Sequence, residues 1–205
     1  MIIDEQPLMR QGMIHFFKEY FPKTQIQESS NISDSLKKLR LEDFDIIILD
    51  ILLDGTNNLD HIKDIKQVRP STPVLVFSSI DEHMALRAIR NGASGFIRKN
   101  ESLEELQRAV TKLLDGGVYI NPDMAEKLAT RLQDDYSGPI HEKLTDREFQ
   151  IFLKIGSGKT VSIIAKELTL SVKTVSTYRS RILKKMHLST NMEIMRYVIT
   201  NRLLP

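Results

Sequence analysis

The stretch Ile46-Ile47-Ile48-Leu49-Asp50 decides the fold of the first part of the chain, because four apolar residues in a row end abruptly at a carboxylate. A continuous apolar run of this length is typical of a strand that is buried on both faces of a parallel sheet. A second run, Val74-Leu75-Val76-Phe77, ends in the same way at Ser78. The two runs together predict a parallel sheet with polar residues at the carboxyl ends of its strands.

On both sides of these runs, short apolar segments alternate with amphipathic ones. Strands are expected at residues 1–3, 25–28, 46–49, 74–77 and 95–97. Helical periodicity falls between and after them, at residues 8–20, 33–40, 59–68, 82–91 and 103–114. Five strand-helix units predict an α/β domain with helices on both faces of a sheet in the order 2-1-3-4-5. The first expected strand is short, which would fit a native start further upstream.

The second part of the chain has a different pattern. Gly116-Gly117 ends the last of these helices, and Asn121-Pro122-Asp123 is typical of the start of a short helix at 124–132. Turn-forming residues then mark a linker, and residues 144–204 show only helical periodicity, interrupted twice. We therefore predict a first domain at residues 1–118, a linker with a short helix at 119–140, and an all-α domain of four short helices at 141–205.

Composition and charge narrow the class of protein. The 205 residues are 41% hydrophobic and contain no Cys, which excludes disulfides and thiol chemistry. No apolar run reaches the ~18 residues that a membrane span needs, and no signal peptide precedes the first strand, so we expect a cytoplasmic protein without membrane contact.

The charges are divided unevenly along the chain. Residues 1–138 carry 17 Lys/Arg against 22 Asp/Glu, and residues 139–205 carry 12 against 5. The net charges of −5 and +7 indicate an anionic partner for the second domain.

Five polar residues follow four of the expected strands of the first domain. Because the carboxyl ends of these strands meet at one edge of the sheet, these side chains should converge there. Crowded carboxylates repel each other, and a hard divalent cation such as Mg²⁺ would relieve that cost. A lysine and a hydroxyl group are suited to the oxygens of a phosphoryl group that is transferred to a carboxylate. The residues are Asp4, Glu5, Asp50, Ser78 and Lys99.

Residues 1–118 resemble the receiver domain of bacterial two-component response regulators, which has a flavodoxin-like fold. The stretch Ile3-Asp4-Glu5-Gln6-Pro7-Leu8-Met9-Arg10-Gln11-Gly12 is similar to the start of the NarL/FixJ subfamily, and Gly92-Ala93-Ser94-Gly95-Phe96 followed by Lys99 matches its last strand-helix unit. The resemblance implies that Asp50 is the phosphoacceptor and that Lys99 contacts the phosphate. It further implies Ser78 and Phe96 as switch residues, and a Mg²⁺ site formed by Asp4, Glu5, Asp50 and the backbone carbonyl of Leu52.

Three positions depart from the pattern of this family. Glu5 stands where Asp is more usual, Gln6 where His is common, and Asp54 where Pro normally precedes Gly55. Glu5 can still coordinate a metal ion. Asp54 removes a conformational restraint and adds a negative charge near the phosphorylation loop. A receiver that is no longer phosphorylated therefore stays an alternative interpretation.

Residues 141–205 resemble the LuxR-type helix-turn-helix domain. The resemblance is carried by Leu144-Thr145-Asp146-Arg147-Glu148, Ile164-Ala165-Lys166-Glu167-Leu168 and Ser171-Val172-Lys173-Thr174-Val175-Ser176. Thr145 and Glu148 have the spacing of a capping box at a helix start. We expect the second helix to bury Ile163, Ile164 and Leu168, and the third to start near Val172.

The third helix is the expected reader of the major groove, with its N-terminal half directed at base edges. By family position, the hydroxyl groups of Ser176, Thr177 and Ser180 face the bases, where Ser and Thr discriminate weakly. Most of the remaining candidates are basic and would neutralise phosphates. The full set of expected DNA contacts is Lys173, Thr174, Ser176, Thr177, Tyr178, Arg179, Ser180, Arg181 and Lys184.

The resemblances together imply a response regulator that is not an enzyme. A sensor histidine kinase would phosphorylate Asp50 with Mg²⁺ as cofactor, which would control homodimerisation and binding to promoter DNA, with RNA polymerase as a further possible partner. One alternative is a phosphorylation-independent DNA-binding regulator with a degenerate receiver. A weaker one is a phosphoaspartyl hydrolase of related fold, which would need an acid/base residue beside its nucleophile and usually a cap domain.

Overall fold

The computed structural model describes residues 1–53, 56–57, 59–79, 82–121, 125 and 139–204. The chain divides into two compact units, residues 1–129 and 130–205. The division falls inside the linker predicted at 119–140. Asp54 and the helix expected at 124–132 lie outside the described residues, apart from residue 125.

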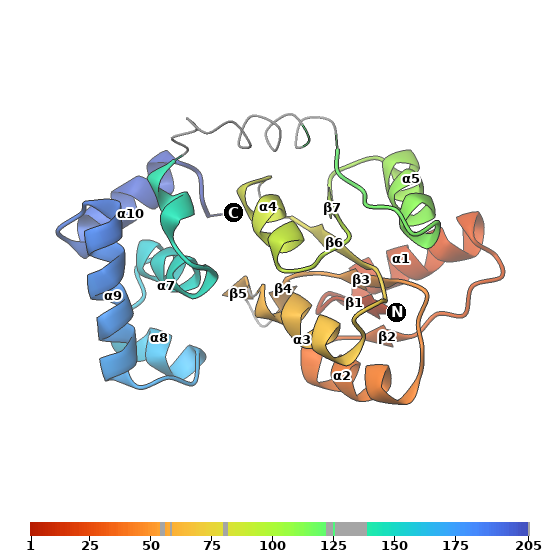
Figure 1. Cartoon of the computed structure of the whole chain (residues 1–205), viewed down its shortest axis with the longest axis horizontal. Helices are drawn as coiled ribbons and strands as arrows, with labels where there is room; N and C mark the ends of the chain where they lie inside the picture. Colours follow the sequence, from red (N-terminus) through yellow and green to blue (C-terminus); the bar gives the residue numbers. More distant parts are fainter. Residues whose placement is uncertain (54–55, 58, 80–81, 122–124, 126–138, 205) are drawn as a thin grey trace. The chain divides into compact units, whose positions relative to one another are not determined.

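The first unit is a three-layer α/β domain (Figure 1). Its five-stranded sheet has the order β2-β1-β3-β6-β7 with every neighbouring pair parallel, which confirms the predicted order 2-1-3-4-5. A small antiparallel hairpin, β4 with β5, was not predicted. The elements are β1 (Ile2–Ile3), α1 (Pro7–Tyr20), β2 (Glu28–Ser29), α2 (Ile32–Leu41), β3 (Ile47–Leu49), β4 (Leu52–Leu53), β5 (Thr56–Asn57), α3 (Asp60–Val68), β6 (Val74–Ser78), α4 (Glu82–Arg90), β7 (Gly95–Arg98) and α5 (Leu103–Leu114).

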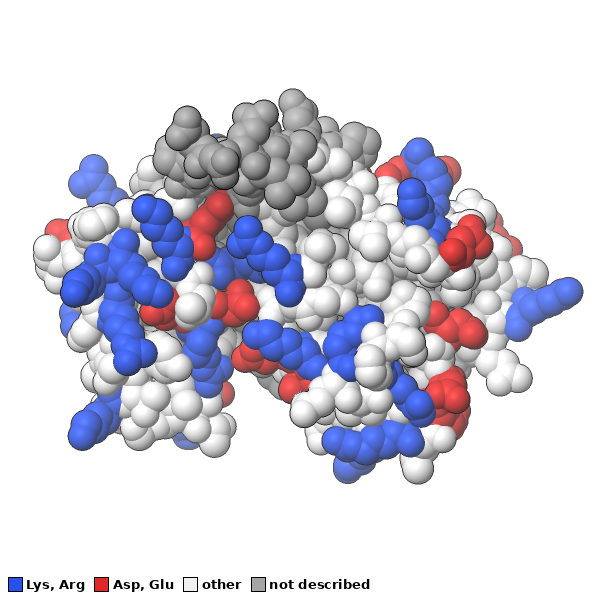
Figure 2. All heavy atoms as spheres, viewed as in Figure 1, with Lys and Arg blue, Asp and Glu red and all other residues white. Residues whose placement is uncertain are grey.

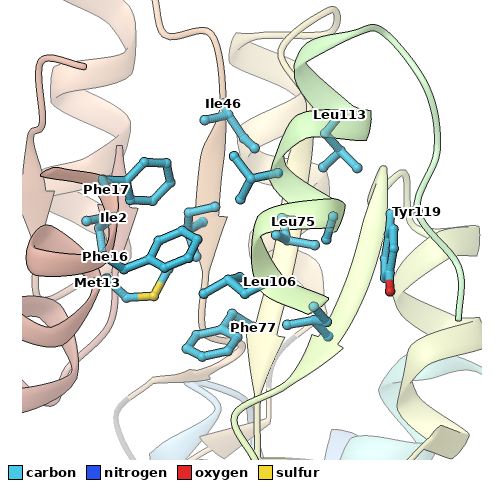
Figure 3. Packing of buried hydrophobic residues seen from close by; sticks show 14 residues of the cluster. Ile2, Met13, Phe16, Phe17, Ile46, Leu75, Phe77, Leu106, Leu113 and Tyr119 are labelled. Atoms are coloured by element: carbon cyan, nitrogen blue, oxygen red, sulfur yellow. The ribbon is translucent and has the colours of Figure 1, made fainter. Parts of the chain in front are cut away.

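The central strands are buried on both faces, as their continuous apolar sequence predicts. Residues alternate between the two faces of a strand, so Leu75 and Phe77 point one way and Val74 and Val76 the other. Leu75 and Phe77 belong to a core cluster with residues of α1 and α5 such as Phe16 (Figure 3). Val74 and Val76 are also fully buried, which places them in the core on the opposite face. Helices therefore cover both sides of the sheet.

The register of the strands brings their carboxyl ends to one edge. Ile3 pairs with Leu49, and Leu49 pairs with Val76. The residues that follow, Asp4 and Asp50, are therefore neighbours across the sheet.

The edge strands of the sheet are β2 and β7. On one side lies β2, with two residues. On the other, the chain returns beside β7 through a single parallel bridge between Gly95 and Tyr119, and the Tyr119 N–H donates to the Ser94 carbonyl at 2.9 Å. Tyr119 is the first residue of the predicted linker, and its side chain is buried in the core of the first unit (Figure 3).

The described part of the second unit, residues 139–204, is helical, with the four predicted α-helices and a short 3₁₀ helix before them. Both α7 and α10 begin with a full capping box, formed in α7 by Thr145 and Glu148 as predicted. One burial prediction is wrong, because Ile163 is 48% exposed while Ile164 is fully buried and Leu168 half-buried. The short helix α8 buries only the side that faces its neighbours. The elements are η1 (Ile140–Lys143), α7 (Asp146–Gly156), α8 (Val161–Glu167), α9 (Val172–Met186) and α10 (Asn191–Thr200).

Helices α7 and α10 approach each other closely at Gly156. A Cβ atom placed on Gly156 would lie 2.6 Å from Cγ2 and 2.9 Å from Cβ of Val198. Carbon atoms in contact normally stand ~3.5–4.0 Å apart, so the close packing of these two helices depends on glycine here. Among the helices that the structure describes, none is both long enough and apolar enough to cross a membrane.

Candidate functional site

Four side chains meet at the carboxyl edge of the sheet in the first unit. The Lys99 ammonium lies 2.6 Å from Oδ2 of Asp4 and 2.6 Å from Oδ2 of Asp50. The Ser78 hydroxyl donates to Oδ1 of Asp50 at 2.7 Å. The structure thus brings together residues from the ends of four strands, β1, β3, β6 and β7.

Backbone groups fix the orientation of the two carboxylates. The Gln6 N–H donates to Oδ1 of Asp4 at 2.8 Å, and the Leu52 N–H donates to Oδ1 of Asp50 at 2.9 Å. Asp50 is 2% exposed and Asp4 is 3% exposed. Two buried carboxylates are therefore held side by side, each by a donor two residues further along the chain.

The Lys99 cation compensates the charge of this pair. Burial by itself would lower the pKa of Lys99, but its hydrogen bonds to Asp4 and Asp50 and their negative charges outweigh burial and raise that pKa above the usual value. The lysine therefore stays protonated at neutral pH. Because unpaired buried charges are costly, Lys99 stabilises the acidic edge in the absence of any other cation.

The donors around Asp50 suit an incoming phosphoryl group. Its carboxylate is a nucleophile of the kind that forms acyl phosphates. The Ser78 hydroxyl, the Leu52 N–H and the Lys99 ammonium all donate to this carboxylate. Each can also donate to the oxygen atoms of a phosphoryl group bound there.

A hard divalent cation fits the donor set of the site only in part. Asp4 and Asp50 offer buried carboxylate oxygens on neighbouring strands, the ligands that Mg²⁺ prefers. The described residues hold no group of three or more carboxylate or imidazole side chains arranged for a metal, and the Lys99 ammonium donates to both Asp4 and Asp50. Glu5 is half-buried beside Asp4, and its role as a ligand stays a prediction.

The remaining residues expected in the first unit lie close to this group. Phe96 is 4% exposed on β7, where it pairs with Val76 of β6. Leu52 is half-buried at the start of β4, and its N–H is the group that contacts Asp50. Its carbonyl was predicted as a metal ligand, and that role is untested.

The residues expected to contact DNA lie on α9 of the second unit. The N-cap of α9 is Ser171, whose side chain accepts from the Thr174 N–H, so the helix begins at Val172 as predicted. Val175, Ile182 and Met186 are buried and attach α9 to the core. Six of the nine candidates are exposed, and each of the six carries a charge or a hydroxyl group. The exposed candidates are Lys173, Ser176, Thr177, Ser180, Arg181 and Lys184, while Thr174, Tyr178 and Arg179 are half-buried.

Lys and Arg side chains gather over α9 at the left of Figure 2, in the view of Figure 1. A helix that exposes cations and hydroxyl groups along one face can bind phosphates and reach base edges. The hydroxyl groups of Thr177 and Ser180 donate to backbone carbonyls one turn earlier, Lys173 and Ser176. Their oxygens therefore face an incoming base chiefly as acceptors.

Arg179 has an internal contact that its sequence position did not predict. Its Nε donates to Oδ1 of Asn191, the first residue of α10, at 2.6 Å. The guanidinium thus links the middle of α9 to the start of α10. Arg179 therefore helps to position the neighbouring helix, and its contact with a phosphate stays a prediction.

Two sets of ion pairs connect α9 and α8 to α7. Burial would raise the pKa of Glu148, but hydrogen bonds from Lys185 and from Thr145 outweigh it and hold that pKa below the usual value. Hydrogen bonds from Lys154 and Lys159 lower the pKa of Glu167. These lysines serve the fold of the unit and were not among the predicted DNA contacts.

Sequence patterns missed the contacts made by backbone groups and by Arg10. The Arg10 guanidinium donates to the carbonyls of Asp4 and Glu5 and to the carboxylate of Glu28. A single arginine on an amphipathic helix is usually a solvated charge, so its type alone gave no signal. The available signal was its position one helical turn after the acidic pair.

Two families of known domains match the chain. The description "Response regulator receiver domain" matches residues 1–111, and "Bacterial regulatory proteins, luxR family" matches residues 142–198. These ranges fall in the first and the second compact unit respectively.

Relatives along the full chain carry the same combination. The transcriptional activator protein ExaE of Pseudomonas putida is 30% identical over 210 residues, which cover 100% of this chain and 97% of that protein. The response regulator GacA of Pseudomonas aeruginosa is 28% identical, over 95% and 92% of the two chains. Among solved structures, RcsB of Salmonella enterica serovar Typhimurium, bound to promoter rprA in the presence of phosphomimetic BeF3-, aligns over 96% of each chain with a TM-score of 0.71 and 20% identity, which supports the fold.

The family matches exclude the phosphoaspartyl hydrolase that the sequence left as an alternative, because the relatives are regulators and the second unit is a DNA-binding domain. Both units, their order and their chemistry agree with one family. The chain belongs to the LuxR-family response regulators, DNA-binding transcription regulators that join a receiver domain to a LuxR-type helix-turn-helix domain and are not enzymes.

Proposed function

We propose that phosphorylation of Asp50 controls the binding of this regulator to promoter DNA. The observation that carries the proposal is the buried Asp50 carboxylate, to which a hydroxyl group, a backbone N–H and an ammonium group donate. Each of these donors can serve a phosphoryl oxygen as readily as a carboxylate oxygen. The phosphodonor would be a sensor histidine kinase or a small acyl phosphate.

The transfer itself requires no further reactant. A carboxylate oxygen of Asp50 attacks phosphorus, the bond from phosphorus to the donor atom breaks, and the donor leaves with its bonding electrons. With acetyl phosphate as donor, acetate is the leaving group. Lys99 neutralises charge that gathers on the phosphoryl oxygens, and Ser78 donates to one of them.

Asp4 and Asp50, with Glu5 and the Leu52 carbonyl, would hold Mg²⁺. When bound, Mg²⁺ supplies the positive charge that a phosphoryl group requires beside two carboxylates. For this to happen, the Lys99 ammonium has to move away from at least one carboxylate oxygen, and its long side chain allows that.

The phosphorylated state would be signalled through Ser78 and Phe96. Ser78 is fully buried and follows Phe77 on β6, so a new bond from its hydroxyl group to a phosphoryl oxygen would pull on the segment that leads to α4. Phe96 is buried on the neighbouring strand β7, where it pairs with Val76 of β6, so a shift of β6 would reach it. Phosphorylation would then bias an equilibrium between two conformations.

In the second unit, the N-terminal half of α9 would enter the major groove. The hydroxyl groups of Ser176, Thr177 and Ser180 would face bases, and Lys173, Arg181 and Lys184 would contact phosphates, together with Tyr178 and Arg179. Thr174 would be a further DNA contact. The exposure of the first six of these residues supports the assignment. Weak direct readout by hydroxyl groups leaves part of the specificity to DNA shape and bridging water.

A homodimer would read paired half-sites. On α10, Met192, Met195 and Ile199 are 78%, 38% and 66% exposed, and their spacing puts them on one face of the helix. An exposed apolar stripe of this kind favours burial against a second copy. One solved structure that aligns with this chain contains "two RcsB dimers bound to two parallel DNAs". RNA polymerase would be a further partner in the cytoplasm.

Intact mass spectrometry after incubation with acetyl phosphate tests this function. We expect the full-length protein to gain the mass of one phosphoryl group when Mg²⁺ is present and not when it is chelated. The Asp50→Asn variant, which keeps the shape of the side chain, should gain nothing. Phosphorylated protein should then bind duplexes selected from a random-sequence pool more tightly than unphosphorylated protein.

The same experiment distinguishes the proposed function from the alternative of a degenerate receiver. In that case the wild type would acquire no adduct under any condition, yet it would still bind the selected duplexes. Asp54, near the phosphorylation loop, and the short first strand are the sequence features that keep this alternative open.

A further inference from the structure

We propose that Arg10 is a positioning residue that fixes the acidic segment of the phosphoacceptor site and thereby sets its affinity for Mg²⁺. The proposal rests on the function proposed above and assigns a role to a residue outside the predicted site. Arg10 lies in the second turn of α1. Its Nη1 donates to the carbonyl oxygen of Asp4 at 2.9 Å and to that of Glu5 at 3.2 Å.

The guanidinium is itself anchored from the neighbouring strand. Its Nε donates to Oε2 of Glu28 at 2.8 Å, and the Arg10 side chain is only 16% exposed. Glu28 lies on β2, where it pairs with Ile2, and its carbonyl accepts a hydrogen bond from Lys38 at 2.8 Å. Arg10 therefore connects β2 to the segment that follows β1.

These bonds determine how the Asp4 and Glu5 peptides are oriented. The two carbonyls accept from one planar guanidinium, so they must point to the same side of the chain. The Asp4 carboxylate is held separately, by the Gln6 N–H and by Lys99. With the carbonyls directed at Arg10, the Asp4 carboxylate is left facing Asp50.

A metal ion that demands near-ideal octahedral geometry binds best when its ligands are oriented beforehand. Groups that orient metal ligands without touching the metal typically alter affinity by about 10–100-fold when they are removed. Arg10 is such a group, because it orients Asp4 and Glu5 without being a metal ligand itself.

The charge of Arg10 would act in the opposite direction. A cation beside the site repels Mg²⁺, so its removal by itself should strengthen metal binding. Loss of positioning should weaken metal binding. The sign of the change in an Arg10→Met variant therefore distinguishes a positioning role from a mere electrostatic one.

The test uses the full-length protein with two readouts. The first is the rise in unfolding temperature with Mg²⁺ concentration in the absence of a phosphodonor, which reports binding directly. The second is the Mg²⁺ concentration for half-maximal phosphorylation by acetyl phosphate. For Arg10→Met we expect both to require about 10-fold more Mg²⁺. The extent of phosphorylation at saturating Mg²⁺ should match the wild type, because Asp50 and Lys99 are untouched.

Three further variants complete the test. Glu28→Gln keeps the charge of Arg10 but weakens its anchor, and it should shift both readouts in the same direction by less. Arg10→Lys keeps the charge without the planar group and should also require more Mg²⁺. Arg108→Met removes a cation that is 70% exposed on α5 and should change nothing.

The outcomes differ for the two proposals. If the wild type responds to Mg²⁺ but Arg10→Met needs the same concentration or less, the positioning role is wrong while the proposed function stands. If Arg10→Met does not fold, an unchanged Mg²⁺ requirement in both Arg10→Lys and Glu28→Gln overturns it equally. If the wild type neither binds Mg²⁺ nor takes up a phosphoryl group, the proposed function fails and this inference fails with it.

Discussion

Lys99 links the stability of the first unit to its chemistry. Its side chain is 7% exposed and bridges two carboxylates that would otherwise repel each other in a buried place. The raised pKa of Lys99 keeps this compensation intact at neutral pH. The same ammonium group is the one that an incoming phosphoryl group would attract, so a structural ion pair is available for a functional role.

Arg179 is expected to contact a DNA phosphate from the middle of α9. An Arg179→Ala variant should weaken binding to all duplexes by a similar factor, because phosphates carry no sequence information. The slope of log affinity against log salt should fall in magnitude by about one. Fluorescence anisotropy with several selected and unrelated duplexes at a series of salt concentrations measures both quantities.

Asn191→Ala is the matched control, because it removes the contact with Nε of Arg179 and keeps the charge. It should leave the salt slope unchanged. Should Asn191→Ala lose as much affinity as Arg179→Ala, the arginine acts by positioning α10, and the phosphate contact is contradicted.

Residues at strand ends could be predicted from the sequence, whereas their backbone partners could not. Asp50 and Ser78 stand directly after apolar runs and Lys99 stands two residues after one, and parallel strands bring such positions together. The N–H of Leu52 and the guanidinium of Arg10 make contacts at the site that depend on the path of a loop. Apolar periodicity does not encode that path, so these contacts became visible only in the structure.

At the level of helices, the contact between α7 and α10 depends on Gly156. A Gly156→Ala substitution places a methyl group against Val198, so the two helices must separate. We expect the second unit to lose about 1–3 kcal/mol of unfolding free energy, as for other overpacked interiors. Thermal or urea unfolding followed by circular dichroism measures this loss.

Gly12→Ala provides the control for this substitution. Gly12 lies within α1, and a Cβ atom there meets nothing within 4 Å. Alanine should stabilise that helix by up to about 1 kcal/mol through its better helix propensity. Equal effects of the two substitutions would show that helix propensity, and not the contact with Val198, governs position 156.

Long periodic helices and most of the apolar strands were predicted almost to the residue, whereas the two-residue strands β2, β4 and β5 were not. The helix at 103–114 matches α5, because its apolar residues recur regularly and Ser102 caps its start. Strand β2 occupies Glu28–Ser29 and not 25–28, since a strand of two residues is defined by its partner β1 more than by its own composition. The hairpin of β4 and β5 is equally short.

At the scale of the whole molecule, α10 is the surface on which we expect two copies to meet. An Ile199→Glu substitution puts a charge in the exposed apolar stripe without touching the buried residues Ile194 and Val198. Light scattering should show less dimer of the phosphorylated protein. Binding to duplexes with two half-sites should fall by at least tenfold, since each copy would then bind alone.

Leu41→Glu is the control for this prediction. Leu41 is 82% exposed at the end of α2 in the receiver unit, so the change in charge is the same and at least as large a fraction of an exposed apolar side chain is replaced. It should leave dimerisation and DNA binding unaltered. Dimers that persist in Ile199→Glu but not in Leu41→Glu would move the interface from α10 to the receiver.

The order of the strands also governs how the protein behaves at high concentration. The continuous apolar runs Ile46–Leu49 and Val74–Phe77 supply the central strands β3 and β6, which are each paired on both sides and so offer no free strand edge to another chain. Only unfolding exposes these two runs. Turbidity on heating should therefore begin at the unfolding transition and not below it, so concentrated native solutions should stay clear.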